Sequence, residues 1–250
     1  MVYNGIALRH EKKYFISTVT QALISERLKR AIRSDENSDE EGGYTVTSLY
    51  LDDLFNSAYN EKMAGILDRC KYRIRMYKNN PKNLILEKKI KHGEYIGKVS
   101  CKLTNEQYKA IITGQKAEIL LDSDNKLLHE VFAKMRVDRL SPKVVVEYDR
   151  EVYIADQGNV RITFDKKLRA GLHSLDIAEL NYNKISAIAE DRLIMEVKFD
   201  AFLPSFIRNL LNETGKENSS ISKYVICADI ENLYGGCFYN GQHTIVPRHI

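Results

Sequence analysis

Polar and apolar residues alternate along several short segments of the chain, which is the spacing of strands with two different faces. In the segment 73–77, Arg73 and Arg75 alternate with Ile74 and Met76. Turn-forming residues such as His92-Gly93 separate neighbouring segments. Short connections favour hairpins, so the pattern predicts about eight strands in a largely antiparallel sheet. The strands are expected at 9–15, 44–51, 70–78, 83–91, 94–101, 143–154, 159–166 and 193–200.

Helical periodicity lies between and after these strands. The segment 17–33 predicts a helix that begins at Ser17 or Thr18, because a hydroxyl side chain is a favourable N-cap. Its apolar residues share one face and are Val19, Leu23, Ile24, Leu28 and Ile32. The segment 34–43 is acidic, ends in Gly-Gly and predicts a mobile loop, with a metal-binding loop as the alternative. Further helices are expected at 104–113, 125–137, 203–213 and 222–234.

Composition indicates an ordinary globular protein, with 44% hydrophobic and 29% charged residues among 250. We find no repeat or linker and expect one domain over 1–250. The four cysteines form no C-x-x-C pair, which argues against zinc or a disulfide framework and favours a reducing, cytoplasmic location. No signal peptide or apolar run of about 20 residues is present, so any membrane association would come through a membrane-protein partner.

Charged residues recur two positions apart on several expected strands and therefore share a face of each strand. A solvated outer face is one explanation. The other is the inside of a barrel, where two like charges about 5 Å apart repel by roughly 3 kcal/mol and call for a polyanion. Cations would then hold phosphates, and the few carboxylates would hold a divalent metal bridging them. The members of this pattern are Arg9, Glu11, Lys13, Lys71, Arg73, Arg75, Glu87, Lys89, Lys91, Arg150, Arg161, Asp165, Glu196 and Lys198.

Seven short motifs carry these residues in order along the chain. They are Arg9-His10-Glu11-Lys12-Lys13-Tyr14, Arg73-Ile74-Arg75-Met76-Tyr77, Leu86-Glu87-Lys88-Lys89, Tyr148-Asp149-Arg150, Val160-Arg161-Ile162-Thr163-Phe164-Asp165, Met195-Glu196-Val197-Lys198 and Ser222-Lys223-Tyr224. Each motif alone is weak, but the ordered set resembles the VTC domain, the polyphosphate-polymerase module of the vacuolar transporter chaperone family. That family belongs to the triphosphate tunnel metalloenzymes, also called CYTH-like proteins. The resemblance covers about residues 7–236.

The resemblance implies an α+β fold: a closed eight-stranded antiparallel β-barrel with flanking helices. It implies transfer of the terminal phosphate of ATP to polyphosphate, with Mn²⁺ or Mg²⁺. The expected catalytic residues are Lys13, Arg73, Arg75, Lys89 and Arg161. The expected phosphate-binding residues are Arg9, Lys98, Arg150, Lys198 and Lys223, with Lys102 as the alternative to Lys98. The expected metal ligands are Glu196, Glu11 and Glu87.

Arg9 departs from the hydrolase and cyclase branch, whose first strand opens with a glutamate at this position. This departure favours the VTC branch, and with it polymerase activity, over the alternative of a triphosphatase or nucleotidyl cyclase. A non-catalytic polyphosphate-binding module is a further alternative, and Glu11, Glu87 and Glu196 argue against it because a simple anion-binding site gains nothing from carboxylates. The expected partners are ATP, triphosphate or polyphosphate. We expect no nucleic-acid binding, because the chain has no Trp and its aromatic residues do not interleave with the basic positions.

Overall fold

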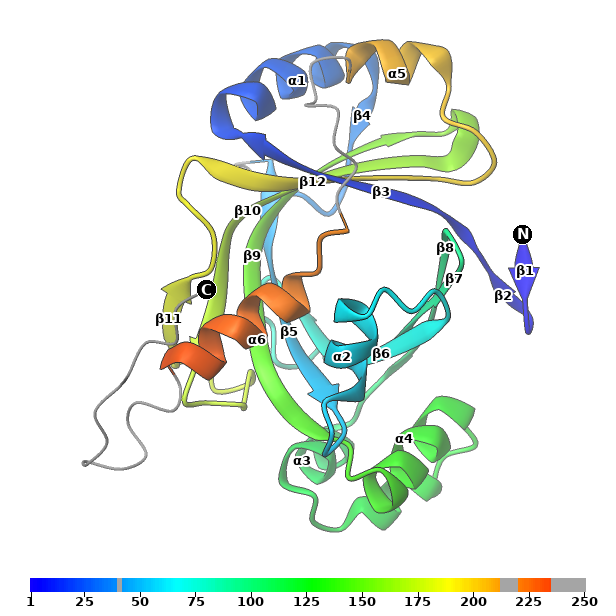
Figure 1. The fold of residues 1–250 in the computed structure, drawn as a ribbon, viewed down its shortest axis with the longest axis vertical. Coiled ribbons are helices and arrows are strands. Elements are labelled where there is room, and N and C mark those ends of the chain that lie inside the picture. The colour runs from blue at the N-terminus through cyan, green and yellow to red at the C-terminus, as the bar shows by residue number, and fades with distance from the viewer. Residues whose placement is uncertain (40–41, 212–219, 235–250) are drawn as a thin grey trace.

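Eight antiparallel strands close into a barrel in the computed structural model, which describes residues 1–39, 42–211 and 220–234 (Figure 1). Their order around the wall is β10-β12-β3-β8-β7-β6-β5-β9, and β9 pairs with β10 to complete the ring. The α+β barrel predicted from the sequence is therefore confirmed. The bounds are β3 (Arg9–Ser17), β5 (Gly43–Asp52), β6 (Arg69–Tyr77), β7 (Ile85–His92), β8 (Tyr95–Lys102), β9 (Ser141–Ala155), β10 (Val160–Leu172) and β12 (Arg192–Phe199).

Four short strands that the pattern did not predict flank the barrel. A hairpin of β1 (Val2–Tyr3) and β2 (Ile6–Ala7) precedes it, β4 (Arg33–Ser34) pairs with β9, and β11 (Asn183–Ser186) pairs with β10. Segments of two to four residues are too short to show an alternation. Strand β10 runs beyond its expected end because a register shift between Lys166 and Arg169 interrupts the alternation there.

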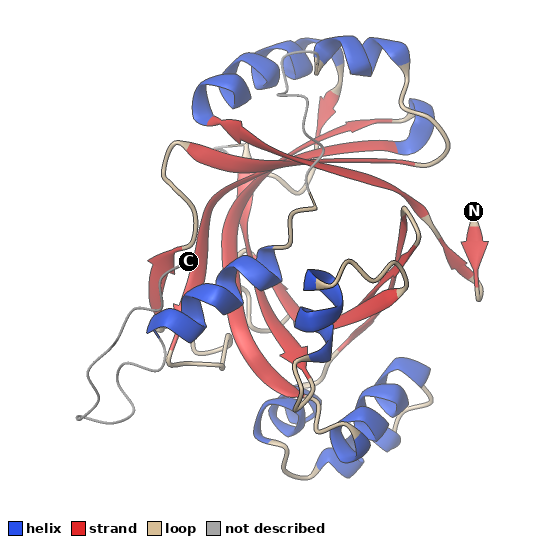
Figure 2. Ribbon diagram, in the orientation of Figure 1, coloured by secondary structure: helices blue, strands red, loops and turns tan. Residues whose placement is uncertain are grey.

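Six helices surround the strands (Figure 2). Helices α1 and α5 lie side by side at one end of the molecule, and α3 and α4 lie at the opposite end (Figure 1). The helix expected at 203–213 is shorter, and residues 212 and 213 fall outside the described residues. The bounds are α1 (Thr18–Ala31), α2 (Ser57–Met63), α3 (Asn105–Thr113), α4 (Lys126–Val137), α5 (Ser205–Leu210) and α6 (Lys223–Tyr234), with 3₁₀ turns at Ala117–Leu121 and Gln157–Asn159.

Helix α1 begins as predicted, since the Ser17 hydroxyl accepts a hydrogen bond from the Thr20 amide at 3.1 Å. The predicted buried face is wrong in part. Ile24 and Leu28 are fully buried, whereas Val19 and Leu23 are 70% and 50% exposed. A narrower stripe of the helix therefore faces the sheet. On that stripe, Ser25 donates a hydrogen bond to Glu151 of β9 at 2.9 Å.

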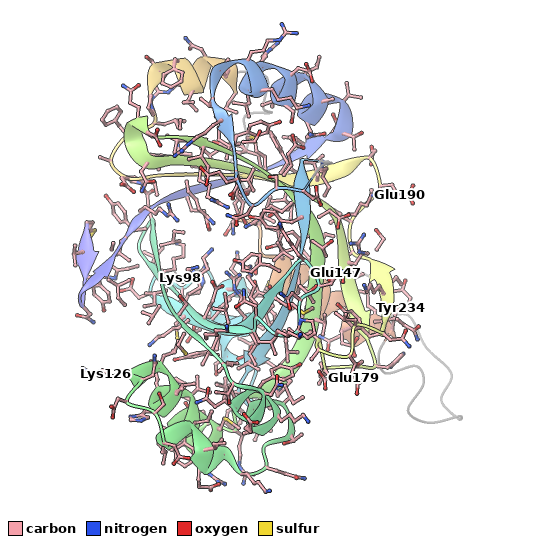
Figure 3. All side chains as sticks on the ribbon, turned by 180° about the vertical axis from the view of Figure 1, so that it is seen from behind. Lys98, Lys126, Glu147, Glu179, Glu190 and Tyr234 are labelled. Atoms are coloured by element: carbon pink, nitrogen blue, oxygen red, sulfur yellow. The ribbon has the colours of Figure 1, made fainter. Side chains whose placement is uncertain are left out.

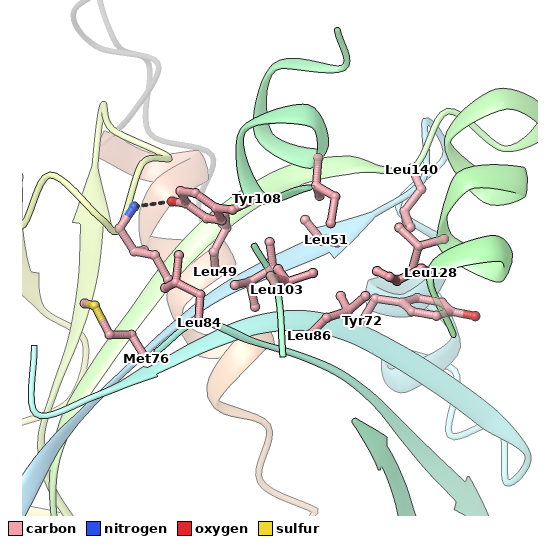
Figure 4. Packing of buried hydrophobic residues seen from close by; sticks show 14 of the residues in the cluster. Leu49, Leu51, Tyr72, Met76, Leu84, Leu86, Leu103, Tyr108, Leu128 and Leu140 are labelled. Atoms are coloured by element: carbon pink, nitrogen blue, oxygen red, sulfur yellow. Dashed lines mark hydrogen bonds between the residues drawn. The ribbon is translucent and has the colours of Figure 1, made fainter. Parts of the chain in front are cut away.

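Helices cover the apolar faces of the strands. Figure 4 shows one such layer, in which Tyr108 of α3 and Leu128 of α4 pack near Leu86 of β7. Helix α6 is different, because it packs against Val146 of β9 and Ala170 of β10, which are paired with each other. Val146 lies on the same face of β9 as Arg150. One helix therefore packs on the charged side of the barrel wall.

Three cysteines of the described chain, Cys70, Cys101 and Cys227, are free thiols. Cys237 lies outside the described residues. Among the helices that the structure describes, none is both long and apolar enough to cross a bilayer.

Candidate functional site

Most of the alternating charges of the strands line a cavity of about 530 Å³. The explanation by a solvated outer face is therefore wrong for these residues. Twelve of the lining residues are lysine or arginine and three are glutamate, so the wall carries a large excess of positive charge. Nine of the predicted site residues line this cavity, namely Glu11, Lys13, Arg73, Arg75, Lys89, Arg150, Glu196, Lys198 and Lys223.

Glu87 lies behind the lining arginines and is only 1% exposed. Its Oε2 accepts hydrogen bonds from Arg73 Nε at 2.8 Å, and its Oε1 accepts one from Lys98 Nζ at 2.7 Å. Arg75 approaches Oε2 at 3.6 Å. Burial alone would raise the pKa of Glu87, but these three cations hold that pKa well below its usual range. Glu87 therefore contacts three cations but does not itself line the cavity.

Arg161 and Arg9 also lie outside the cavity lining. Arg161 donates hydrogen bonds to Asp35 at 2.7 Å and to the Tyr44 hydroxyl at 3.1 Å. Asp35 is buried, so the prediction of a mobile acidic loop is wrong at this residue. The electrostatic influence of Arg9 reaches Lys198, whose pKa burial lowers first and Arg9 lowers further.

Two carboxylates, Glu11 and Glu196, share the same lysines within the cavity. Glu11 lies 3.1 Å from Lys13 and 3.6 Å from Lys198, and Glu196 lies 3.8 Å and 3.3 Å from these two ammonium groups. Lys223, from the first turn of α6, lies 2.8 Å from Glu196. Burial opposes ionisation, but the surrounding cations still hold the pKa of each glutamate well below its usual range. Both carboxylates are therefore charged and close to each other.

Asp165 was on the predicted charged face but not among the predicted site residues. It is fully buried and accepts two hydrogen bonds from Arg150, at 2.6 and 2.7 Å, and Lys223 lies 2.5 Å away. The Tyr148 ring lies beneath both of these cations, and its hydroxyl accepts a hydrogen bond from Arg75 at 3.1 Å. Tyr148 thus contacts three cations of the site.

The donor set fits a divalent metal that arrives with phosphate oxygens. Among the described residues, no group of three or more His, Cys, Asp or Glu could hold an ion by itself. Mg²⁺ in such sites takes one or two carboxylates and completes its shell with water and substrate phosphates. Glu11 and Glu196 are the carboxylates that line the cavity and lie near each other.

Burial, and after it the neighbouring positive charges, lowers the pKa of two lining lysines. The pKa of Lys89 is lowered to about 7, mainly by burial and further by Lys13 and Lys198, although Glu11 and Glu196 oppose the shift. The pKa of Lys71 is lowered to about 6 by burial and then by Lys13 and Lys89, with no acid among its main neighbours. The cavity is thus electrostatically strained without an anion.

Several lining residues were not among the predicted site residues. Lys71 and Lys91 belonged to the alternating pattern, whereas Lys62 lies on α2, a helix without apolar periodicity. Ser220 and Ser222 line the cavity ahead of α6. The motif Ser222-Lys223-Tyr224 was the available signal for that segment.

Comparison with known proteins agrees with this architecture. Among solved structures, a putative adenylyl cyclase from Hippeastrum, described as having a dominant triphosphatase activity, matches with 13% identity and a TM-score of 0.53, over 89% of this chain and 95% of that one. A putative adenylate cyclase from Bacillus halodurans matches with 11% identity and a TM-score of 0.46, over 98% and 96%. No curated protein sequence matches the chain. At 13% identity, the likeness to the Hippeastrum protein is one of fold.

The family comparison is more specific than the fold. The model of the VTC domain matches residues 8–231, a range that contains all eight strands of the barrel and every lining residue of the cavity. The chain therefore belongs to the VTC domain family.

Proposed function

We propose that this chain is a metal-dependent polyphosphate polymerase that transfers the terminal phosphate of ATP to a polyphosphate chain held in the barrel. The observation that carries the proposal is the charge of the cavity, whose lining includes twelve Lys or Arg and three Glu. Guanidinium and ammonium groups on rigid strands match phosphate oxygens. A chain of phosphates is the ligand that satisfies so many cations at once.

The proposed reaction is an in-line phosphoryl transfer. A terminal oxygen of the polyphosphate attacks the γ-phosphorus of ATP, the bond from that phosphorus to the β–γ bridging oxygen breaks, and ADP leaves with the electron pair. The attacking oxygen is anionic near neutral pH, so no base is required. Catalysis then rests on alignment and charge neutralisation by residues such as Arg73, Arg75 and Lys223. A bound Mn²⁺ or Mg²⁺, held by Glu196 and Glu11, would neutralise further charge on the phosphates.

We assign Glu87 and Asp165 as positioning residues, because each is a buried carboxylate that contacts two of the lining cations. Glu87 contacts Arg73 and Arg75, and Asp165 contacts Arg150 and Lys223. Fixing these cations before the substrate arrives lowers the cost of reorganisation during the reaction. Arg161, Arg9 and Lys98 do not line the cavity, and their expected roles in catalysis and phosphate binding stay predictions.

The second candidate is a triphosphatase or nucleotidyl cyclase on the same barrel, favoured by the nearby pair Glu11 and Glu196, which suits a metal-activated water. The Hippeastrum protein of this fold is described as having a dominant triphosphatase activity. A polyphosphate-binding module without catalysis is the third candidate, and it gains nothing from carboxylates inside the cavity.

The test is incubation of the protein with ATP and Mn²⁺ or Mg²⁺, followed by gel separation of polyphosphate and by assay of ADP and orthophosphate. We expect a ladder of chains and ADP in proportion to the phosphate incorporated. Glu196→Gln should abolish turnover, whereas Lys126→Gln, on the exposed face of α4, should not alter it (Figure 3). Orthophosphate without chains would overturn the polymerase in favour of the hydrolase, and no turnover would favour the binding module.

A further inference from the structure

Lys71 differs from most other lysines of the cavity in the groups that surround its amine. Four lining lysines each lie within 4.0 Å of a carboxylate, namely Lys13, Lys89, Lys198 and Lys223. In the described part of the chain, Lys71 has no carboxylate within that distance. Its Nζ donates a hydrogen bond to the Ser222 hydroxyl at 3.1 Å and lies 4.9 Å from the centre of the Tyr224 ring. The nearest partners of this amine are therefore neutral.

The charged groups that act most strongly on Lys71 are all cations. Arg69 stands two positions before it on β6, and Lys89 is its partner on β7. Lys13 and Lys62 act on it from β3 and α2. Burial lowers the pKa of Lys71 first, and these four cations lower it further, to about 6. Desolvation and like charge both disfavour the ammonium form, so the two causes act in the same direction.

Lys71 is consequently an uncharged amine at pH 8 in about 99% of molecules, given its pKa of about 6. A lysine with an ordinary pKa near 10.4 is uncharged in only about 0.4% of molecules at that pH. Only the uncharged amine has a lone pair for attack, and lysines beside other cations are activated as nucleophiles in this way. Lys71 also lines the open cavity, so a small molecule can reach it.

The surroundings of this amine select a class of electrophile. A cavity with a large excess of cations concentrates small anions and repels cations. Ammonium and guanidinium groups such as those of Lys13 and Arg69 match phosphate oxygens. An acyl phosphate carries an anionic phosphate and a reactive carbonyl carbon in one small molecule. The same cations also stabilise the negative charge that develops on the carbonyl oxygen during attack by an amine.

We propose that Lys71 is a modification site at which small acyl phosphates acylate the protein without a second enzyme. Its Nζ attacks the carbonyl carbon, the bond from that carbon to the bridging oxygen breaks, and the phosphate leaves with the electron pair. The proton of the amine passes to the leaving phosphate, so the products are an amide on Lys71 and hydrogen phosphate. The amide has no charge at any pH. The reaction does not depend on the proposed function; only its effect on polyphosphate binding does.

The test treats the native protein with acetyl phosphate to low conversion and measures acetylation of each lysine by peptide mass spectrometry. Lys126, exposed on α4, is the internal control (Figure 3). At pH 8 Lys71 should react at least about tenfold faster than Lys126, because far more of its amine is uncharged. Between pH 8 and pH 10 the rate at Lys126 should rise by more than about tenfold, whereas the rate at Lys71 should stay nearly constant.

A second reagent separates recognition of the phosphate from reactivity of the amine. The N-hydroxysuccinimide ester of acetic acid is an uncharged acetylating reagent without phosphate. Its preference for Lys71 over Lys126 should be several-fold smaller than that of acetyl phosphate. Excess orthophosphate should slow the reaction of acetyl phosphate at Lys71 and should leave the reaction at Lys126 unchanged.

Equal rates at Lys71 and Lys126 with acetyl phosphate at pH 8 would overturn the proposal. Equal preferences with the two reagents would also overturn it, since the cavity would then not select the phosphate.

Calorimetry with tripolyphosphate keeps this inference separate from the proposed function. Acetylation should weaken binding to the native protein several-fold, whereas the same treatment of Lys71→Arg, which keeps the charge but not the nucleophile, should have little effect. Equal weakening in both proteins would refute the effect assigned to Lys71. If the untreated native protein did not bind tripolyphosphate, the proposed function would fail and the acylation site would stand on the mass spectrometry.

Discussion

The lowered pKa values of Lys71 and Lys89 predict that a phosphate chain draws protons into the cavity when it binds. At pH 8 the empty protein holds about one tenth of a proton on Lys89 and far less on Lys71, given pKa values of about 7 and 6. A polyanion favours the charged form of both lysines and restores their protonation. Binding of long polyphosphate at pH 8 should therefore take up about two protons.

The same shifts set the pH dependence of affinity. Between pH 8 and 9 each of the two lysines costs about 1.4 kcal/mol more to protonate, so affinity should fall about a hundredfold over that unit. The terminal phosphates, with a second pKa near 6, are fully ionised in this range and contribute little. For the empty protein the sign is opposite. Unfolded lysine holds its proton up to about pH 10, so stability from these groups rises as pH increases from about 7 to 10.

Calorimetry in buffers of different ionisation enthalpy measures the proton uptake directly. Lys71→Gln should reduce the uptake at pH 8 from about two protons to about one and should halve the slope of log affinity against pH. Lys126→Gln should change neither quantity. If the native protein bound polyphosphate at pH 8 without proton uptake, both lysines would be charged in the empty cavity and the electrostatic reasoning would be refuted.

Three further predictions concern single residues. Triphosphate at a hundredfold excess over its dissociation constant should stabilise the native protein by about 2.7 kcal/mol, or about 5–10 °C in melting temperature. Arg73→Ala should lose most of that shift in differential scanning fluorimetry. An equal shift in the variant would mean that Arg73 does not touch the ligand. Gly43→Ala should lower the free energy of unfolding in urea by about 1–3 kcal/mol, because the new Cβ would lie 2.8 Å from the carbonyl oxygen of Arg150. An unchanged midpoint of urea unfolding would show that the strands separate at little cost. Tyr224→Phe should cost about 1–3 kcal/mol in the same assay by removing the 2.6 Å hydrogen bond to Asp52, and no loss would mean that water replaces it.

The barrel interior could be predicted from the sequence because it follows from a local rule. Residues such as Arg73, Arg75 and Glu196 stand two apart from other charges, and a closed sheet has a single inside on which such residues must meet. Their convergence on one cavity therefore required no knowledge of long-range contacts. The ordered motifs gave the family for the same reason, since each lies within one strand or helix.

What the sequence did not show depends on contacts between distant segments. Arg161 pairs with Asp35, which lies 126 positions away along the chain, and no local pattern indicates that pair. Helix α2 contains no apolar repeat; Asp52 stabilises its start by accepting hydrogen bonds from the amides of Ala58 and Tyr59. The expected metal ligand Glu87 contacts cations of two neighbouring strands and does not line the cavity, and the spacing of charges along its own strand does not reveal this position.

The seam between β3 and β8 has a consequence for how a polymer could be loaded. In the described chain these strands share only the pairs Arg9 with Ile96 and His10 with Tyr95, whereas β3 and β12 share eight. Strand β8 begins at Tyr95, so the part of β3 after His10 has no β8 residue opposite it, and Lys12 and Ile96 beside the seam line the cavity. A wall joined so briefly can part locally at low cost. An internal stretch of a long polymer could then slip in sideways, and its ends would not have to be threaded through a closed ring.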